Sequence, residues 1–339
     1  MSSIIYGKDF AMKINTASLL IHPEELNRKW ICRCADLKIP TLALHPVGGF
    51  RSPLTMKAML DLLETSEYRK LIDEAVEKGL QIEYEMHAAR YFLPASEFER
   101  HPEWFRMDEE GNRTPKLNCC ASNSEGLDFI AKRAAETVKK LYRSSHRYFF
   151  WLDDAPDAFC HCPKCAQYSA ADQQLIIMNR MLEEIRKTDP EAELAYLAYY
   201  STLTPPKKIR PNEGIFLEYA PIDRDHHTPL SCADNEKNKS QNRYIEELVQ
   251  FFGQKNAKVL DYWLDNSLFS DWKKPPKAFS PDEKVIHSDF DYYSNLGFRD
   301  ISCFACYLGE DYEALHGEPD IKPFAEAFLR LKADETVTF

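Results

Sequence analysis

Two adjacent carboxylates, Asp153 and Asp154, directly follow a short aromatic and apolar segment at residues 148–152. Paired acids suit cleavage of a glycosidic bond, in which one carboxylic acid protonates the leaving oxygen and a second group attacks or activates water. Neighbouring side chains on an extended strand point to opposite sides, so only one of the pair can face a pocket. We predict that Asp154 faces it and that Asp153 orients Asp154. The alternative is that Asp154 begins a turn or caps a helix, because Asp-Ala-Pro-Asp is also ordinary turn chemistry.

The second catalytic carboxylate has several candidates at the ends of other apolar segments. Glu218 and Asp265 are the first two, and Glu310 is a further option. Any of them could instead bind a substrate hydroxyl. We therefore predict that the catalytic carboxylates are among Asp153, Asp154, Glu218 and Asp265, and we place Glu310 with the substrate-binding residues.

Aromatic, basic and polar side chains stand at or just after the ends of the same segments. Aromatic faces suit the C–H side of a sugar ring, and polar groups suit its hydroxyls. Arginines would pair with the carboxylate of an acidic sugar. A lone histidine such as His87 more often makes a hydrogen bond within the protein, but Arg90 and a long loop follow this one. The predicted substrate-binding residues are His87, Arg90, Trp151, Tyr199, Arg224, His227, Trp263, Tyr307 and Glu310.

A cysteine triple follows the acidic pair and consists of Cys160, Cys162 and Cys165. Three thiols at this spacing resemble three corners of a tetrahedral zinc site. Cys120 or Cys119 would supply the fourth corner, with His161 as a further option. A zinc ion with a full set of thiolates has no open position for water, so we expect a structural zinc and no organic cofactor. The alternative is unmetallated thiols or a disulfide.

An alternation of short apolar segments and amphipathic helical patterns would position these residues. The predicted strands are residues 17–21, 41–45, 80–86, 148–152, 193–199, 215–219, 258–262 and 300–304. Alternating strands and helices form parallel sheets with right-handed crossovers. Eight units favour a closed barrel, and the chain has no glycine-rich nucleotide-binding motif that would favour an open sheet. We predict an α/β fold, a single (β/α)8 TIM barrel spanning residues 1–339.

Two connections are longer than the usual median of roughly 4–6 residues. They are residues 90–123, after the third strand, and residues 221–240, after the sixth. Both leave the C-terminal ends of strands, where barrel enzymes place their active sites. The link between the fifth and sixth strands has no clear helix.

Composition excludes some functions. The 339 residues carry a net charge of −11, and no basic stripe is available to bind nucleic acid. No segment is long and apolar enough to cross a bilayer. The first residues lack the pattern of a signal peptide, so we expect a cytoplasmic protein that does not bind membranes. The sequence leaves the oligomeric state open.

Several local motifs together resemble a known family. They are His-Pro-Glu-Trp-Phe at residues 101–105, Asp-Glu-Glu-Gly-Asn-Arg at 108–113, Cys-Ala-Ser-Asn at 120–123, the stretch from Asp154 to Cys165, the stretch from Tyr196 to Pro206, and residues 221–235. This pattern is similar to that of an uncharacterised family of glycoside-hydrolase-like TIM barrels, a domain of unknown function with a Cys-x-Cys-x-x-Cys motif. The family is allied in fold to α-glucuronidases and β-hexosaminidases.

The resemblance implies a carbohydrate-active barrel, and it favours Cys120 over Cys119 as the partner of the cysteine triple. The hexosaminidases place an Asp-Glu pair at the end of the fourth strand, and Asp153-Asp154 departs from that pair by one methylene.

The leading hypothesis is a glycosidase that acts on an oligosaccharide or polysaccharide fragment, one that could carry a uronic acid. The alternative is a carbohydrate-binding pseudoenzyme on the same fold. A third hypothesis, a metal-dependent hydrolase that uses the cysteine cluster, ranks below both because catalytic zinc keeps an open position.

Overall fold

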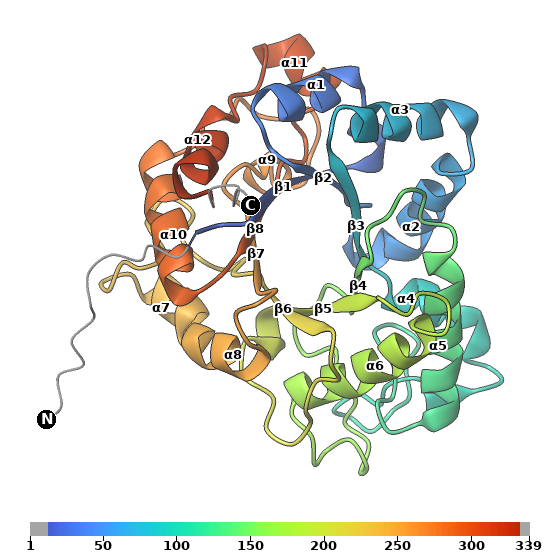
Figure 1. Ribbon diagram of the computed structural model, residues 1–339. Helices are drawn as coiled ribbons and strands as arrows, with labels where there is room; N and C mark the ends of the chain where they lie inside the picture. The colour runs from blue at the N-terminus through green and yellow to red at the C-terminus, as the bar shows by residue number, and fades with distance from the viewer. Residues whose placement is uncertain (1–12, 333–339) are drawn as a thin grey trace, which may run out of the picture.

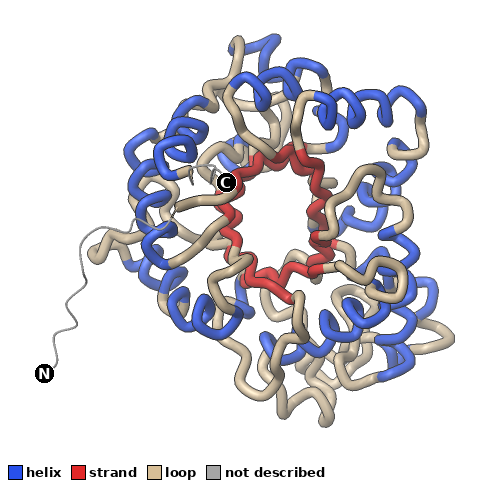
Figure 2. Tube along the Cα trace, viewed as in Figure 1, coloured by secondary structure: helices blue, strands red, loops and turns tan. Residues whose placement is uncertain are grey.

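A computed structural model describes residues 13–332, which form a closed barrel of eight parallel strands (Figure 2). Each strand pairs with the next along the chain, and β8 pairs with β1. The strands are β1 (Thr16–Ile21), β2 (Thr41–Leu44), β3 (Gln81–His87), β4 (Arg147–Trp151), β5 (Glu193–Ala198), β6 (Ile215–Tyr219), β7 (Lys258–Asp261) and β8 (Asp300–Phe304). All eight predicted strands are confirmed, and each begins and ends within one residue of its predicted bounds.

The helices form an outer ring around the strands (Figures 1 and 2). They are α1 (Arg28–Asp36), α2 (Ser52–Leu62), α3 (Ser66–Glu77), α4 (Ala89–Phe92), α5 (Ser124–Val138), α6 (Ala170–Ile185), α7 (Glu236–Asn242), α8 (Ile245–Phe252), α9 (Asn266–Phe269), α10 (Glu283–Leu296), α11 (Glu310–His316) and α12 (Lys322–Leu331). Between β5 and β6 there is a single 3-10 turn, η5 (Tyr200–Thr202), as the missing helical pattern predicted.

The long connections after β3 and β6 are also confirmed. Residues 88–123 link β3 to α5 and contain α4 and two 3-10 turns, η3 (Ala95–Glu97) and η4 (Pro102–Trp104). Residues 220–235 link β6 to α7. Both connections leave the C-terminal ends of their strands, where they can shape a site over the barrel mouth.

Alternation along the strands decides which side chains fill the barrel. Residues two apart on a strand share a face. Leu260 on β7 faces the barrel interior, and Tyr262 therefore faces inward as well. Near the other end of the barrel, Lys258 is buried beside Glu83 and Glu85, with its Nζ 3.1 Å and 2.5 Å from their carboxyl oxygens. The interior of the barrel is therefore a packed core.

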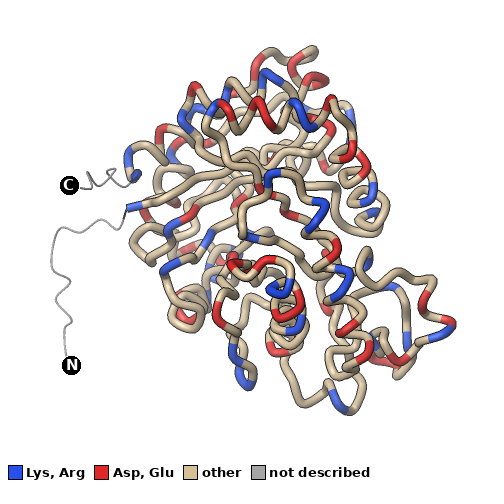
Figure 3. Tube along the Cα trace, turned by 45° about the vertical axis from the view of Figure 1, so that its right-hand side comes forward, with Lys and Arg blue, Asp and Glu red and all other residues tan. Residues whose placement is uncertain are grey.

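Acidic and basic residues are interspersed along the Cα trace in Figure 3. Within residues 13–332, no helix combines the length and apolar character needed to cross a membrane.

Candidate active site

A cavity of about 640 Å³ opens at the C-terminal ends of the strands. Residues at or after the end of every strand line it, which makes it the site that the barrel as a whole positions. Those that matter most below are His22, His45, His87, Trp151, Asp154, Tyr199, Tyr262, Asp265, Trp272, Lys274, Phe304 and Tyr307.

Asp154 lies in the wall of this cavity. The chain leaves the extended conformation after Trp151, and the following turn brings the Asp154 carboxyl inward. The Tyr199 hydroxyl donates a hydrogen bond of 2.8 Å to its Oδ1. Asp154 also lines a second hollow of about 210 Å³, together with Phe50 and Arg90. The carboxyl group thus stands where the two hollows meet.

Asp153 has a different environment from its neighbour. Its side chain is buried, Oδ2 accepts a 2.5 Å hydrogen bond from the Asn118 backbone N–H, and its own N–H donates to Asn118 Oδ1 at 2.7 Å. Burial raises the pKa of Asp153 to about 6. The partner of Asp153 is the loop after β3, so Asp153 holds that loop against β4 and makes no hydrogen bond that orients Asp154 directly.

Asp265 lines the same cavity as Asp154. It is the N-cap of α9, and its Oδ1 accepts hydrogen bonds from the N–H groups of Ser267 and Leu268 and from the Ser267 hydroxyl. The side chain is buried, and burial raises its pKa to about 6. Of the predicted partners for Asp154, Asp265 is the carboxylate that reaches the cavity.

Glu218 lies deeper than its position at the end of β6 suggested. It is fully buried beneath Trp151, whose Nε1–H donates a 2.7 Å hydrogen bond to it, and Lys258 Nζ lies 3.7 Å from its other oxygen. Burial raises the pKa of Glu218. Because the indole of Trp151 lies above it, Glu218 does not line the cavity, and its expected place at the mouth is corrected.

Four of the predicted substrate-binding residues line the cavity: His87, Trp151, Tyr199 and Tyr307. Arg90 lines the second hollow, where its guanidinium lies 4.6 Å from the centre of the Phe50 ring.

Two predicted binding residues point away from the mouth for clear physical reasons. Arg224 is fully buried between Asp261 and Asp289, at 2.7 Å and 2.6 Å, so its charge is already paired. Trp263 follows the inward-facing Tyr262, so alternation turns its ring outward, where Nε1–H donates to Asp289 at 2.9 Å. Neither can contact a ligand in the cavity.

His227 and Glu310 are also absent from the residues that line either hollow. The ring of His227 lies 6.1 Å from that of Phe269, and the Glu310 carboxylate accepts a 3.3 Å hydrogen bond from Asn27. His227 lies in the connection after β6, and Glu310 is the first residue of α11.

The sequence-based site list missed His22, His45 and Tyr262, which all line the cavity. Each stands two residues beyond a strand residue that packs in the barrel interior, namely Leu20, Ala43 and Leu260. Counting in steps of two past each strand end would have found them.

Four cysteines lie together behind the acidic turn. Cys120, Cys160, Cys162 and Cys165 are buried, and their sulfur atoms all lie within 4.8 Å of one another. Cys120 Sγ is 3.7 Å from Cys162 Sγ and 3.9 Å from Cys165 Sγ. The cluster joins the loop after β3 to the loop after β4 and could hold a metal ion. All ten cysteines are free in the structure, which therefore contains no disulfide among them.

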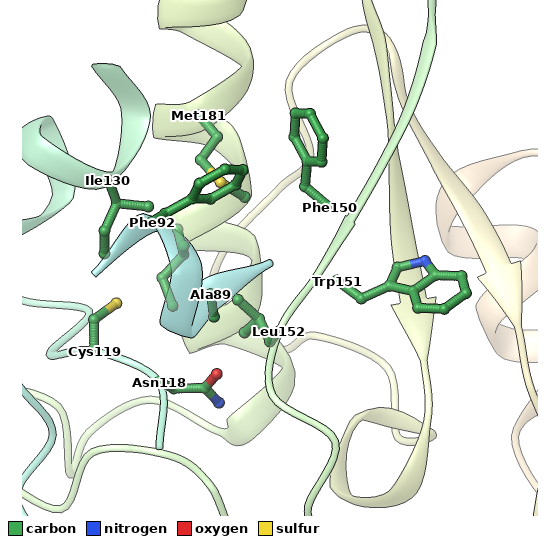
Figure 4. A pocket seen from close by; sticks show the side chains of 10 residues that line it. Ala89, Phe92, Asn118, Cys119, Ile130, Phe150, Trp151, Leu152 and Met181 are labelled. Carbon is green, nitrogen blue, oxygen red and sulfur yellow. The ribbon is translucent and has the colours of Figure 1, made fainter. Parts of the chain in front are cut away.

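The surroundings of this cluster fit a group of metal-bound thiolates. The Met107 N–H donates to Cys160 Sγ at 3.3 Å, and Arg113 Nη1 lies 3.7 Å from the same sulfur. Donors that stabilise negative sulfur are the usual outer shell of a thiolate site. The other candidate, Cys119, instead lines a small, mostly apolar cavity behind β4, on the opposite side of the strand from Trp151 (Figure 4).

The fold and the site together define a (β/α)8 barrel with a carboxylate-bearing cavity at its C-terminal face. A family model described as a domain of unknown function (DUF4838) matches residues 57–308, which is most of the chain. The chain belongs to this family, as the motifs indicated. No curated protein matches the sequence.

Several solved structures with similar folds are glycoside hydrolases. A cold-adapted β-galactosidase from Rahnella sp. R3 has a TM-score of 0.54 at 13% identity, over 95% of this chain and 56% of that one. An O-GlcNAc hydrolase from Thermobaculum terrenum has a TM-score of 0.54 at 11% identity, over 94% and 59%. The GH20 catalytic modules of a pneumococcal exo-β-D-N-acetylglucosaminidase give 0.52 at 11% identity, over 94% and 85%.

These identities establish a shared fold and nothing finer. The chain spans a little over half the length of the first two structures, at 56% and 59%.

Proposed function

We propose that this protein is a glycoside hydrolase that acts on an oligosaccharide or a polysaccharide fragment. The observation that carries the proposal is the position of Asp154, which lines both the deep cavity and the smaller hollow. A substrate that occupied both would place its glycosidic bond beside this carboxyl group. Asp265 supplies a second carboxyl in the deep cavity.

In this proposal Asp154 is the acid and Asp265 is the base or nucleophile. The acid must protonate the oxygen that links the two sugars. That oxygen would lie where the two hollows meet, beside Asp154. The pKa of Asp265, raised by burial to about 6, is close to the pH at which a general base works best. The fixed donors on its Oδ1 keep the carboxylate in one orientation.

The smaller hollow would hold the leaving group. Phe50 is 80% exposed there and offers an aromatic face for a sugar ring. Of the two arginines proposed to bind an acidic sugar, Arg224 is already paired, so a uronic acid in the substrate would contact Arg90. The acidic sugar would then lie on the leaving-group side of Asp154.

The cysteine cluster would bind one structural zinc through Cys120, Cys160, Cys162 and Cys165. Four thiolates complete the tetrahedral shell, so the metal would tie two loops together without entering the chemistry. None of the four lines the deep cavity, which argues against the metal-dependent hydrolase. Ten cysteines without a disulfide are typical of a reducing compartment and support a cytoplasmic location.

The test is a screen of aryl glycosides and uronic-acid oligosaccharides with wild type, Asp154→Asn and the control Asp157→Asn. Asp157 lies on the same turn, is exposed and lines neither hollow. We expect Asp154→Asn to lose turnover of natural linkages but to keep part of its activity on dinitrophenyl glycosides, whose leaving group needs no proton. Undiminished turnover of natural linkages by Asp154→Asn would overturn the assignment.

A carbohydrate-binding pseudoenzyme is the second candidate, because the hydrogen bonds of Asp265 are also those of an ordinary helix cap. It predicts that sugars bind to the wild type, that no substrate in the screen is cleaved, and that Asp154→Asn binds them equally well.

A further inference from the structure

Three histidines form a row along one wall of the deep cavity. His22, His45 and His87 stand at the ends of the neighbouring strands β1, β2 and β3, and all three line the cavity. Their ring centres are 6.0 Å apart between His22 and His45, and 6.1 Å apart between His45 and His87. Pairing of β1 with β2 and of β2 with β3 brings the three strand ends side by side, with His22 in line with His45 and His87 two residues beyond the β3 residue in line with His45.

Each ring is held by the same type of hydrogen bond. Nδ1 of His22 lies 2.8 Å from the backbone oxygen of His45, and Nδ1 of His45 lies 2.8 Å from that of Glu85. Nδ1 of His87 lies 2.6 Å from the backbone oxygen of Leu152. A carbonyl oxygen can only accept, so each Nδ1 must carry a hydrogen and donate it. In a neutral ring this leaves Nε2 as the acceptor.

Burial favours the uncharged form of two rings in the row, those of His22 and His45. It lowers the pKa of His22 and lowers that of His45 further, where the neighbouring rings of His22 and His87 add to the effect. Within residues 13–332, no side chain or backbone group hydrogen-bonds to Nε2 of any of the three. The row therefore presents bare nitrogen acceptors to whatever fills the cavity.

We propose that His22, His45 and His87 bind the hydroxyl groups of an uncharged sugar ring in the deep cavity. The inference rests on the proposed function and adds the chemical class of the sugar on this side of Asp154. Sugar hydroxyls can donate to Nε2. The oxygens of a carboxylate, phosphate or sulfate are acceptors, so they cannot form a hydrogen bond with an unprotonated Nε2. On this proposal the groups that face the row are hydroxyls, and an acidic group of the substrate would lie elsewhere, for example in the hollow beside Arg90.

Aromatic surfaces beside the row fit the same ligand. The ring of His45 lies 4.9 Å from that of Phe304 and 5.5 Å from that of Trp151, and His87 lies 5.1 Å from Trp151. Aromatic faces pack against the C–H groups of a sugar while the histidines accept from its hydroxyls.

A preformed metal site is a poorer explanation of the row. Among the described residues, the groups whose ligand atoms all lie within 4.8 Å are the four-cysteine cluster and the surface group Glu283, His287 and Glu326. The three histidines are not among them.

The first experiment reads the tautomers without any ligand. Nitrogen-15 NMR of histidine-labelled protein should show three rings whose neutral form carries its hydrogen on Nδ1 and leaves Nε2 bare, each assigned by its absence from a single variant. Addition of a bound sugar should move the Nε2 signals. Protonated Nε2 in these rings would overturn the proposal.

The second experiment measures binding by calorimetry in an Asp154→Asn background, so that turnover does not interfere. The probes are the methyl glycosides of glucose, galactose, N-acetylglucosamine and glucuronic acid. His45→Asn keeps a donor near the position of Nδ1 but removes the cavity-facing acceptor, whereas His45→Gln can restore an acceptor at the position of Nε2. His146→Asn, a surface histidine outside the cavity, is the control.

We expect a neutral glycoside to bind about tenfold more weakly to His45→Asn, with partial rescue in His45→Gln and no change in His146→Asn. Tighter binding of the glucuronide than of every neutral probe, or no dependence on His45, would overturn the inference. If the wild type bound sugars in a histidine-dependent way but cleaved none of them, the hydrolase proposal would be contradicted. The proposed sugar-binding role of the three histidines would still stand.

Discussion

The Tyr199 hydroxyl donates a hydrogen bond of 2.8 Å to Asp154 Oδ1, joining the end of β5 to the turn after β4. Both side chains line the deep cavity. This contact fixes the orientation of the carboxyl group that we propose as the acid, and it gives the first prediction.

Tyr199→Phe should lower kcat by roughly 10- to 100-fold, because a hydrogen bond to a carboxyl group contributes about 1.5–3 kcal/mol. The aromatic ring is kept, so the melting temperature should change little. Tyr148→Phe is the matched control, since Tyr148 donates a similar 2.7 Å hydrogen bond to Asp189, away from the cavity. Equal losses of activity in the two variants would show that the Tyr199 contact has no special role.

The proposed base predicts the acid side of the pH profile. Burial raises the pKa of Asp265 from 3.8 to about 6, so this carboxyl is protonated below that pH and cannot act as a base. Its titratable neighbours Tyr262, Cys303 and Cys306 have raised pKa values and stay uncharged in this range. We expect kcat/KM to rise as pH increases through about 6 and Asp265→Asn to be inactive. A profile that is flat between pH 5 and 7 would contradict the role of Asp265.

Asp153 predicts a pH dependence of stability rather than of activity. Its folded-state pKa of about 6 lies above the ordinary 3.8, so its contribution to stability is fully present below pH 3.8 and is lost as pH rises through about 6. The difference corresponds to about 3 kcal/mol. Urea unfolding of wild type and Asp153→Asn at several pH values should show a loss in the wild type that the variant lacks. Parallel pH dependences of the two free energies of unfolding would refute this.

Metal removal should act on stability before it acts on chemistry. We expect one zinc ion per chain by elemental analysis, and a chelator or Cys165→Ser should lower the free energy of unfolding by several kcal/mol, on the order of what structural zinc sites contribute. Cys119→Ser should keep the zinc, because Cys119 lines the separate cavity behind β4. Full zinc content in Cys165→Ser would show that the cluster is not the metal site.

Much of the molecule follows from short-range patterns in the sequence. The alternation of apolar segments and helical patterns located all eight strands, since burial on both faces requires continuous apolar runs. The spacing of Cys160, Cys162 and Cys165 indicated a cluster because these residues belong to one loop. Asp154 was found because the residues at a strand end point toward the barrel mouth.

Only the tertiary structure decided how far each strand-end residue reaches. Tyr262 faces the cavity and Trp263 does not, because adjacent residues just after the end of β7 point to opposite sides. Glu218 is covered by Trp151 from another strand, and Arg224 is paired with Asp261 and Asp289 on later elements. The histidine row likewise depends on the pairing of β1, β2 and β3, which brings three strand ends side by side. The sequence determines the elements and their chemistry locally, but contacts between distant segments determine which groups are left free to act.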